Sequence, residues 1–271
     1  MIFYSAIQPA YLLLPCLGFV VGMLGSMLGG GGGFIFLPLL MLFLNVPSQT
    51  AVTTSLVATL PICFAGAVGH YHEKNVSFRL ASIFAISGIV GSFIGFKILQ
   101  AMTSNALRIL FGIYSILMAI HITVQVTKDK RLGKQNVKDM KSINLGARMK
   151  GLFFGVISGI ITSAFGTSGT APVLSGLFSM RLPVKMVIGT SLFVVMVNTI
   201  FSIGLHFMAS RIDLTLVGFL TTGSCIGALG GSRYLSRISM NKKENKLKYL
   251  YALTIFVIGI LMIISSLNHN I

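Results

Sequence analysis

The sequence predicts an all-α polytopic membrane protein with two inverted repeats, each a glycine-broken helical hairpin plus three transmembrane helices. Hydrophobic residues make up 54% of the 271 residues and charged residues only 10%, whereas soluble domains carry about 25% charged residues. Uncharged apolar runs of about 20 residues, enough to cross a hydrocarbon core, follow one another along most of the chain. The net charge of +16 therefore indicates basic loops beside membrane spans and not a nucleic-acid-binding surface.

An internal repeat is the second observation behind this fold class. When the sequence is shifted by 136 residues, prolines, Thr-Ser pairs, histidines and paired glycines of the first half fall on the same residue types. The matched positions are Pro47 and Pro183, Thr54-Ser55 and Thr190-Ser191, His70 and His206, Gly91 and Gly227, and Gly95 and Gly231. Matches of so many residue types at one spacing favour duplication over chance.

The first repeat, 1–127, opens with a predicted hairpin over 8–45. Its two apolar arms, 8–28 and 34–45, are separated by five consecutive glycines, Gly29 to Gly33. Glycine costs about 1 kcal/mol relative to alanine inside a helix, so five together indicate a break in the helix. Three predicted transmembrane helices complete this repeat: 49–70, 77–99 and 104–127.

The second repeat, 151–271, follows a polar and basic linker over 128–150. Its predicted hairpin, 149–182, is interrupted at the segment FGTSGTAP, where two glycines match Gly30 and Gly33 at the same offset. The sequence therefore predicts a second glycine break in the corresponding place. Three predicted transmembrane helices complete this repeat as well: 185–208, 213–236 and 246–267.

The distribution of Lys and Arg indicates whether each hairpin crosses the membrane or returns to the side where it began. With both hairpins returning and the linker in the cytoplasm, 18 of the 21 Lys and Arg lie on the cytoplasmic side. If the hairpins crossed, 11 would lie inside and 10 outside. Because Lys and Arg concentrate in cytoplasmic loops, we expect returning hairpins and both termini outside. The two repeats are then inverted, as in many secondary transporters.

The predicted spans offer backbone and hydroxyl groups but no carboxylate. All five acidic residues fall in loops or at span ends, which disfavours a cation site within the membrane and suits an anionic substrate. Helices that start at the breaks would present free N–H groups to an anion. The predicted substrate-binding residues flank the breaks, begin the following spans or supply a buried amide: Ser26, Gly29, Gly30, Gly31, Gly32, Gly33, Thr54, Ser55, Gly166, Thr167, Ser168, Gly169, Thr170, Thr190, Ser191 and Asn198.

The matched histidines, His70 and His206, are candidates for proton coupling, because histidine titrates near neutral pH. The alternative is an interfacial residue hydrogen-bonded to headgroups or backbone. No Ser/His/Asp or Cys/His set occurs at a spacing typical of catalysis, so we expect no enzyme activity. The three cysteines lie in apolar runs without a CxxC pair, so no metal site, disulfide framework or cofactor is predicted.

One motif occurs twice in the sequence. A G-x-x-x-G pair precedes a glycine-rich break and a proline, and a Pro…Thr-Ser pattern follows. The first copy is Gly18, Gly22, Gly29 to Gly33 and Pro38, and the second is Gly151, Gly155, Ser158-Gly159, Gly166, Gly169 and Pro172. Over essentially the whole chain, this pattern resembles the TauE/SafE-type sulfite exporter family of membrane permeases. The resemblance implies movement of small sulfur-containing anions, coupled to an ion gradient. A branch that imports thiosulfate relies on cysteines along its path, and neither Cys63 nor Cys225 lies beside a break, which disfavours that branch.

These observations predict a permease that moves a small anion by alternating access. The expected substrate is sulfite, an organosulfonate or a similar sulfur oxyanion, and the expected location is the plasma (inner) membrane of a prokaryote. Its expected partners are the anionic substrate and the lipid bilayer, without nucleic acid. Two alternatives stay open: a passive small-anion channel, and a non-transporting membrane scaffold that docks a partner through the basic linker 128–150.

Overall fold

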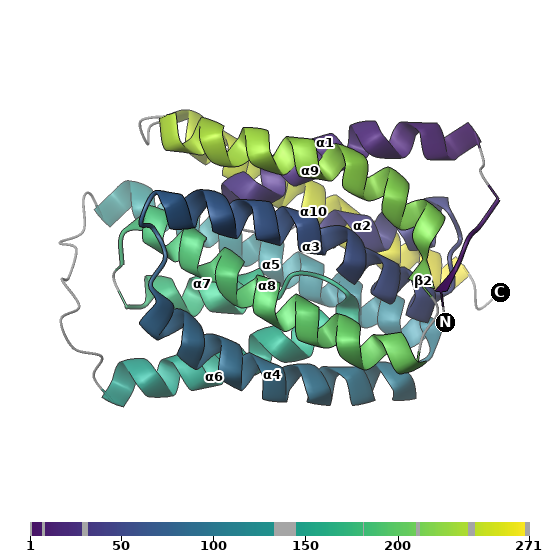
Figure 1. The fold of residues 1–271 in the computed structure, drawn as a ribbon, viewed down its shortest axis with the longest axis horizontal. Coiled ribbons are helices and arrows are strands. Elements are labelled where there is room, and N and C mark those ends of the chain that lie inside the picture. The colour runs from purple at the N-terminus through teal and green to yellow at the C-terminus, as the bar shows by residue number, and fades with distance from the viewer. Residues whose placement is uncertain are drawn as a thin grey trace.

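The computed structural model describes residues 2–6, 9–28, 32–132, 145–180, 182–209, 212–237 and 242–268. These form ten α-helices, two other helical segments and two short strands (Figure 1). The first half contains β1 (Ile2–Phe3), the 3-10 helix η1 (Pro9–Leu13), α1 (Leu14–Leu28), α2 (Gly33–Pro38), the π-helix η2 (Leu39–Phe43), α3 (Ser48–His72), α4 (Phe78–Ala101) and α5 (Ser104–Leu132). The second half contains α6 (Leu145–Phe165), α7 (Thr170–Phe178), α8 (Val184–Ala209), β2 (Ile212–Asp213), α9 (Leu214–Arg237) and α10 (Lys242–Asn268).

Seven helices in the described part of the chain are long and apolar enough to cross a membrane: α3, α4, α5, α6, α8, α9 and α10. This confirms the predicted all-α polytopic membrane class. Six of the seven correspond to the predicted transmembrane helices, and α6 corresponds to the first arm of the predicted hairpin 149–182. The segments Tyr11–Ser26 and Gly33–Phe43 are apolar but shorter.

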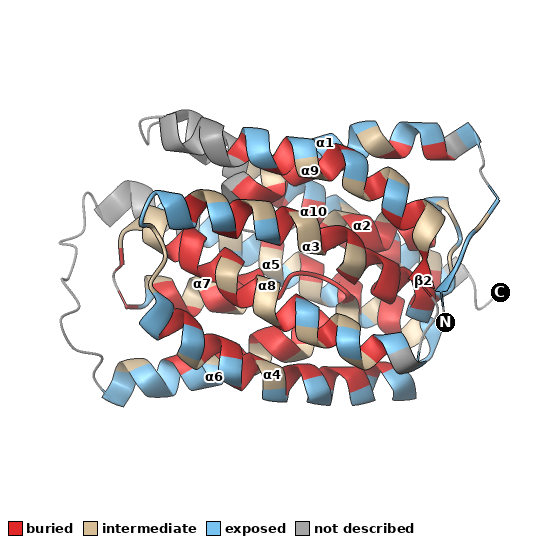
Figure 2. Cartoon of the chain, viewed as in Figure 1, coloured by how far each residue is buried: buried red, intermediate tan, exposed pale blue. Residues whose placement is uncertain are grey.

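Exposed residues lie on the outward faces of the helices and buried residues toward the middle of the bundle (Figure 2), and many of the exposed side chains are large and apolar. On α4, for example, Ile86, Val90 and Phe93 are exposed, whereas Gly88 and Ser92 are buried. A soluble protein would place these residues the other way round. The arrangement is the one expected of a protein whose outer surface contacts lipid and whose helices approach closely through small residues.

Each glycine-broken segment packs against a helix of the other half. Helix α1 packs along α9, and α6 packs along α4 in the corresponding way (Figure 1). Glycines set these approaches, because a methyl group on Gly91 would overlap the backbone of Val156, and one on Gly227 that of Phe19. The remaining close neighbours are α3 with α8 and α9, α4 with α8, and α5 with α10.

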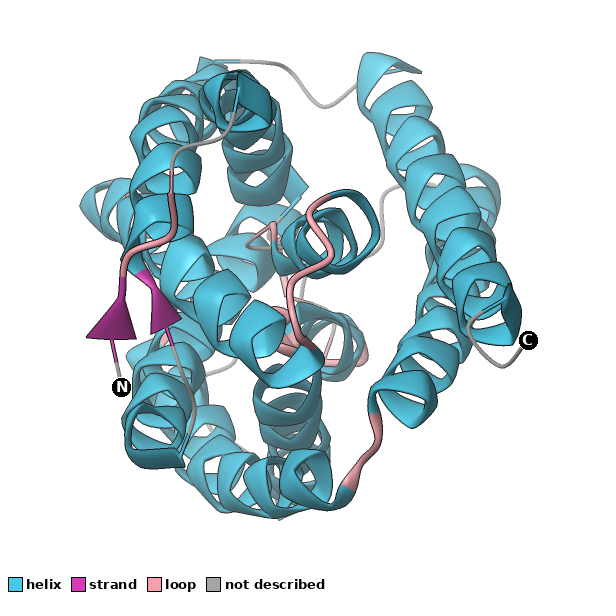
Figure 3. Cartoon of the chain, turned by 90° about the vertical axis from the view of Figure 1, so that its right-hand side faces the viewer, coloured by secondary structure: helices cyan, strands magenta, loops and turns pink. Residues whose placement is uncertain are grey.

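The N-terminal strand and the end of α10 lie at one end of the bundle, and α5 ends and α6 begins at the other (Figure 1). At the first end β1 pairs in parallel with β2, with Ile2 opposite Ile212 (Figure 3). The sequence did not predict this strand pair. Which end faces the cytoplasm stays a prediction, as does the inverted relation of the repeats. Gly29, Gly30, Gly31 and the linker segment 133–144 lie outside the described residues.

Candidate functional site

The two predicted glycine breaks are in direct contact. Gly33 begins α2, and a methyl group placed on it would lie 2.7 Å from Cα of Thr167 and 2.9 Å from the backbone nitrogen of Ser168. Both breaks contain a glycine in the left-handed region, Gly32 with φ of 80° and Gly166 with φ of 62°. Residues other than glycine rarely adopt this backbone conformation. The glycines thus allow both a sharp change in chain direction and a close approach of two backbones.

The second break is anchored to α3 and to its own helix. The hydroxyl of Ser55 on α3 donates a hydrogen bond of 2.9 Å to the carbonyl of Gly166. The amide of Gly169 donates to Oγ1 of Thr162 on α6 at 2.9 Å, and this hydroxyl donates to the carbonyl of Ser158 at 2.8 Å. The Gly169 amide, a predicted anion donor, is therefore already paired in this conformation. Thr162 was not among the predicted site residues, because a threonine inside an apolar run resembles a packing residue.

Two of the predicted hydroxyls hold the starts of neighbouring helices. Oγ1 of Thr190 accepts a hydrogen bond of 3.0 Å from the backbone amide of Ser77, just before α4. Oγ1 of Thr54 accepts one of 3.4 Å from the amide of Asp213, just before α9. Ser77 and Asp213 are themselves 136 residues apart, so the two matched threonines make the same contact in the two halves.

The other predicted hydroxyls divide between local contacts and the break. Ser26 donates to the carbonyl of Met23 at 3.1 Å, and Ser191 donates to that of Ile188 at 2.8 Å. Thr170 donates to the carbonyl of Ser168 within the break at 3.4 Å. Thr167 is fully buried, and its hydroxyl has no hydrogen-bond partner among the described residues. Of the described hydroxyls at the break, that of Thr167 is the one without any hydrogen-bond partner among the described residues.

An aromatic cluster covers the meeting point of the breaks. Tyr114 of α5 stacks on Phe34 with ring centroids 5.4 Å apart and on Phe165 with centroids 5.6 Å apart. Phe111 lies against the same two rings at 6.4 and 5.9 Å. Phe34 follows one break and Phe165 precedes the other, so the aromatic residues of α5 contact a residue next to each break. This cluster could not be predicted from the sequence, because aromatic residues in apolar runs are common.

His206 lies at the bottom of a cavity at the end of the bundle that carries β1. The cavity has a volume of about 280 Å³ and is lined by Gln49, Leu99, Gln100, His206 and Ala209. Nε2 of His206 lies 2.9 Å from the carbonyl oxygen of Ser163 and 3.2 Å from its hydroxyl, and the ring packs edge-on against Phe96 at 4.9 Å. Ser163 is three residues before Gly166, so the cavity reaches close to the second break.

His70 has a different environment from its repeat mate. It is only 3% exposed and lies against Gly189 of α8. Neither ring nitrogen has a hydrogen-bond partner among the described residues. The two histidines therefore occupy matched positions, but of the two only His206 forms a hydrogen bond to a hairpin helix within the described residues.

Asp213 is a buried carboxylate at the start of α9, with 3% exposure. Its Oδ1 accepts hydrogen bonds from the backbone amides of Thr215 and Leu216 at 3.0 and 3.3 Å, and from that of Ser5 at 3.4 Å. It thus caps the positive end of α9 and ties the N-terminal segment to that helix. Its position at a span end agrees with the sequence, whereas its burial was not predicted.

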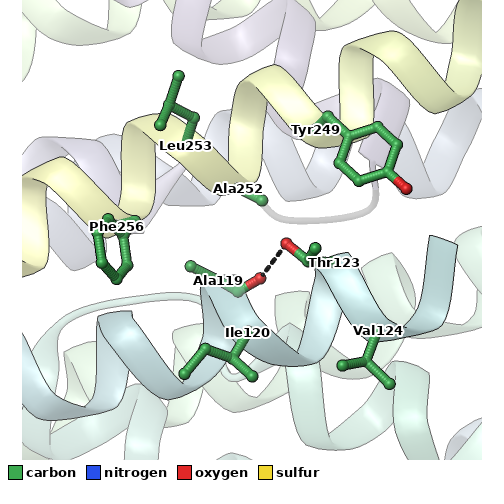
Figure 4. Close-up of a pocket in the computed structure, with 8 residues that line it drawn as sticks. All are labelled: Ala119, Ile120, Thr123, Val124, Tyr249, Ala252, Leu253 and Phe256. Atoms are coloured by element: carbon green, nitrogen blue, oxygen red, sulfur yellow. Dashed lines mark hydrogen bonds between the residues drawn. The ribbon is translucent and has the colours of Figure 1, made fainter. Parts of the chain in front are cut away.

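A second, apolar cavity of about 380 Å³ lies between α5 and α10, and Figure 4 shows its lining. The hydroxyl of Thr123 donates to the carbonyl of Ala119 at 2.8 Å and is satisfied within α5. The side chains of Ile120 and Leu253 are 51% and 59% exposed on this face. The groove therefore has the character of a lipid-facing surface, and the polar groups that suit an anion lie at the breaks.

A polytopic helical bundle in which two broken helices meet is typical of membrane transporters. The chain belongs to the sulfite exporter TauE/SafE family, whose model matches residues 14–262.

Relatives named as probable membrane transporter proteins are found in several organisms. A probable membrane transporter protein of Methanocaldococcus jannaschii is 30% identical over 198 residues, covering 70% of each chain. The probable membrane transporter protein YunE of Bacillus subtilis is 23% identical over 240 residues, covering 82% of this chain and 88% of the relative. A probable membrane transporter protein of Xylella fastidiosa is 26% identical over 249 residues, covering 91% of this chain and 92% of the relative.

Proposed function

We propose that this transporter moves a small sulfur oxyanion or organosulfonate, such as sulfite, by alternating access coupled to an ion gradient. The observation that carries the proposal is the contact of Gly33 with Thr167 and Ser168. It joins two broken helices from different halves of the chain at one point inside the bundle. Broken helices at matching positions of two repeats are typical of the binding sites of secondary transporters.

The chemistry around this contact favours an anion over a cation. Helix α7 starts at Thr170, and the start of a helix carries a partial positive charge. The hydroxyl of Thr167 beside it is buried without a partner among the described residues. Asp213 is the buried carboxylate in the described structure, and its Oδ1 accepts hydrogen bonds from two backbone amides at the start of α9 and from the amide of Ser5. The family description, sulfite exporter, supports a sulfur oxyanion as the substrate class.

Alternating access requires that the site be closed on one side while it is open on the other. The aromatic cluster of Phe34, Phe111, Tyr114 and Phe165 closes the contact of the breaks toward α5. The cavity above His206 gives an approach from the end of the bundle that carries β1. The candidates for ion coupling are then the two histidines, of which His206 lines this cavity.

Flux measurements on purified protein in liposomes test the proposal. We expect saturable uptake of labelled sulfite or of a short sulfonate that accelerates under an opposing ion gradient, with protein-free liposomes as the control. Flux that neither saturates nor responds to the gradient would identify a passive channel instead. No saturable flux of any small anion, together with loss of cellular function when the linker 128–150 is made neutral, would favour the scaffold.

A further inference from the structure

We propose that a column of water molecules between α4, α6 and α8 carries protons between the cavity at His206 and Asn198, beside the second glycine break. The proposal adds a route for the coupling proton to the proposed function. The coupling role of this route rests on the proposed function. The water column itself stands on the packing and burial of the residues that enclose it.

The register of α4 against α8 brings polar residues face to face. Asn198 of α8 contacts Gly88 of α4, because a methyl group on Gly88 would overlap the Asn198 amide. Eight residues further along both helices, the His206 ring packs against Phe96. Ser92 and Ser202 each lie midway between these two contacts. Residues four apart share a helix face, so the two hydroxyls point into the same interface.

The polar atoms along this interface are buried and unsatisfied. Ser92 and Ser202 are both 0% exposed, as are Asn198 and His206. The hydroxyls of Ser92 and Ser202, Oδ1 of Asn198 and Nδ1 of His206 have no hydrogen-bond partner among the described residues. A buried polar atom left unpaired destabilises the folded protein. Four in one interface therefore indicate ordered water, which commonly satisfies buried polar groups.

The hydrogen bond of His206 identifies the atom that handles the proton. A carbonyl oxygen only accepts, so the contact of 2.9 Å to Ser163 places a hydrogen on Nε2 of His206. In the neutral ring Nδ1 then carries the free lone pair. A proton entering from the cavity binds at Nδ1, and the same atom releases it to the next water. No covalent bond of the protein changes, and the charge moves with the proton.

At its inner end the column joins the break through hydrogen bonds. Nδ2 of Asn198 donates to the hydroxyl of Ser158 at 3.4 Å. The carbonyl of Ser158 accepts from Thr162, whose hydroxyl holds the amide of Gly169. A change of charge at His206 is thereby linked through protein groups and water to the backbone where the anion is proposed to bind.

His206 is the titratable group of the proposed column, because the charged groups near it lie outside the interface. Of the helices that enclose it, α4 carries Lys97, which is exposed with its ammonium 5.8 Å from the Phe93 ring centroid. Asp213, beyond the end of α8, is held by the backbone amides of α9. Gln49 of α3 and Ser163 of α6 are uncharged. Among the described residues, His206 is the titratable group whose side chain contacts both α4 and α6 at this interface.

Cysteine accessibility tests the column without any transport assay. In a variant with Cys16, Cys63 and Cys225 replaced by alanine, Ser92→Cys and Ser202→Cys are each exposed to silver ions. The free thiols that remain are counted after denaturation. Val90→Cys and Ile200→Cys are the matched controls, two residues away on the lipid-facing sides of the same helices, where the native residues are 56% and 51% exposed.

We expect the two column cysteines to react at least about tenfold faster than the controls, since a thiol in dry apolar surroundings stays protonated and unreactive. Equal, slow reaction at all four positions would overturn the column. Reaction at the column positions in a protein that shows no anion flux would support the column and refute the proposed function.

The proton role is tested in liposomes loaded with a pH-sensitive dye, with methanesulfonate as the probe because it stays a monoanion and adds no protons of its own. His206→Gln and Ser202→Val are expected to lose proton uptake and pH-driven accumulation while keeping anion exchange at equal pH. Ser82→Ala, on the exposed face of α4, is the control. Proton uptake at the wild-type rate in both column variants would overturn the route.

Discussion

Replacing Gly33 by alanine tests the contact between the two breaks directly. The added methyl carbon would lie 2.7 Å from Cα of Thr167 and 2.9 Å from the nitrogen of Ser168. Optimal carbon contacts are about 3.5–4.0 Å, so the two segments would have to separate by nearly 1 Å. Both neighbours are backbone atoms, which cannot rotate away as a side chain would. Overpacking of this kind costs about 1–3 kcal/mol.

Thermal unfolding in detergent and initial flux in liposomes together measure the effect. We expect Gly33→Ala to lower the melting temperature and to reduce flux strongly, because the proposed site lies between the separated segments. Gly204→Ala is the matched control, since a methyl group at Gly204 of α8 meets no atom within 4 Å. There alanine should be neutral or stabilising by up to about 1 kcal/mol, the propensity difference in a helix.

The reasoning would be refuted if Gly33→Ala and Gly204→Ala gave the same melting temperature and the same flux. A third outcome is also informative. If Gly33→Ala kept its melting temperature but lost flux, the methyl group would disturb the proposed site without destabilising the fold. The two glycine breaks could then move apart in the folded protein.

Three further predictions concern the groups around the breaks. Ser55→Ala should lower the free energy of unfolding by about 1–3 kcal/mol, because the buried carbonyl of Gly166 would lose its hydrogen bond. Denaturant or thermal unfolding measures this effect. The control is Ser191→Ala, which loses only a bond within its own helix, and an equal or larger loss of stability in this control would contradict the prediction. Tyr114→Leu removes two stacked pairs worth about 0.5–1.5 kcal/mol each, so it should destabilise the protein and increase the leak of anions without ion coupling. Liposomes that leak no faster with the variant than with the wild type would argue against a role of Tyr114 in closing the site. Gly91→Ala should prevent α4 from approaching α6 and abolish the well-folded peak in size-exclusion chromatography, whereas normal elution would show that this packing is not tight.

The membrane fold could be predicted from the sequence because long apolar spans leave a uniform signal over many residues. Helix α8 starts one residue before the predicted span 185–208, and α4 starts one residue after the predicted start of 77–99. The first break was predictable for a related reason, since consecutive glycines have few other uses in such a chain, and the repeat offset then predicted the second. These features depend on the sequence pattern alone.

Features that depend on which helices become neighbours were not predictable. Thr162 and Ser163 read as ordinary small residues of an apolar run, yet one holds Gly169 and the other holds His206. The repeat offset correctly pairs Thr54 with Thr190 in their contacts, but it does not predict that His70 lacks the partner that His206 has. A duplication preserves positions, while the neighbours at each position diverge with every later substitution.

The exchange of partners between the halves has a consequence for how the chain is made. Gly18 and Gly22 of α1 pack on Leu220 and Ser224 of α9, so the first hairpin leaves the ribosome long before the surface that covers it. Until α9 inserts, the glycine face of α1 has no helix packed against it within the bilayer. The first hairpin must therefore either be bound by another protein or stay unpacked during that time. If the two halves were produced as separate polypeptides, neither would mature alone, and co-expression would restore both.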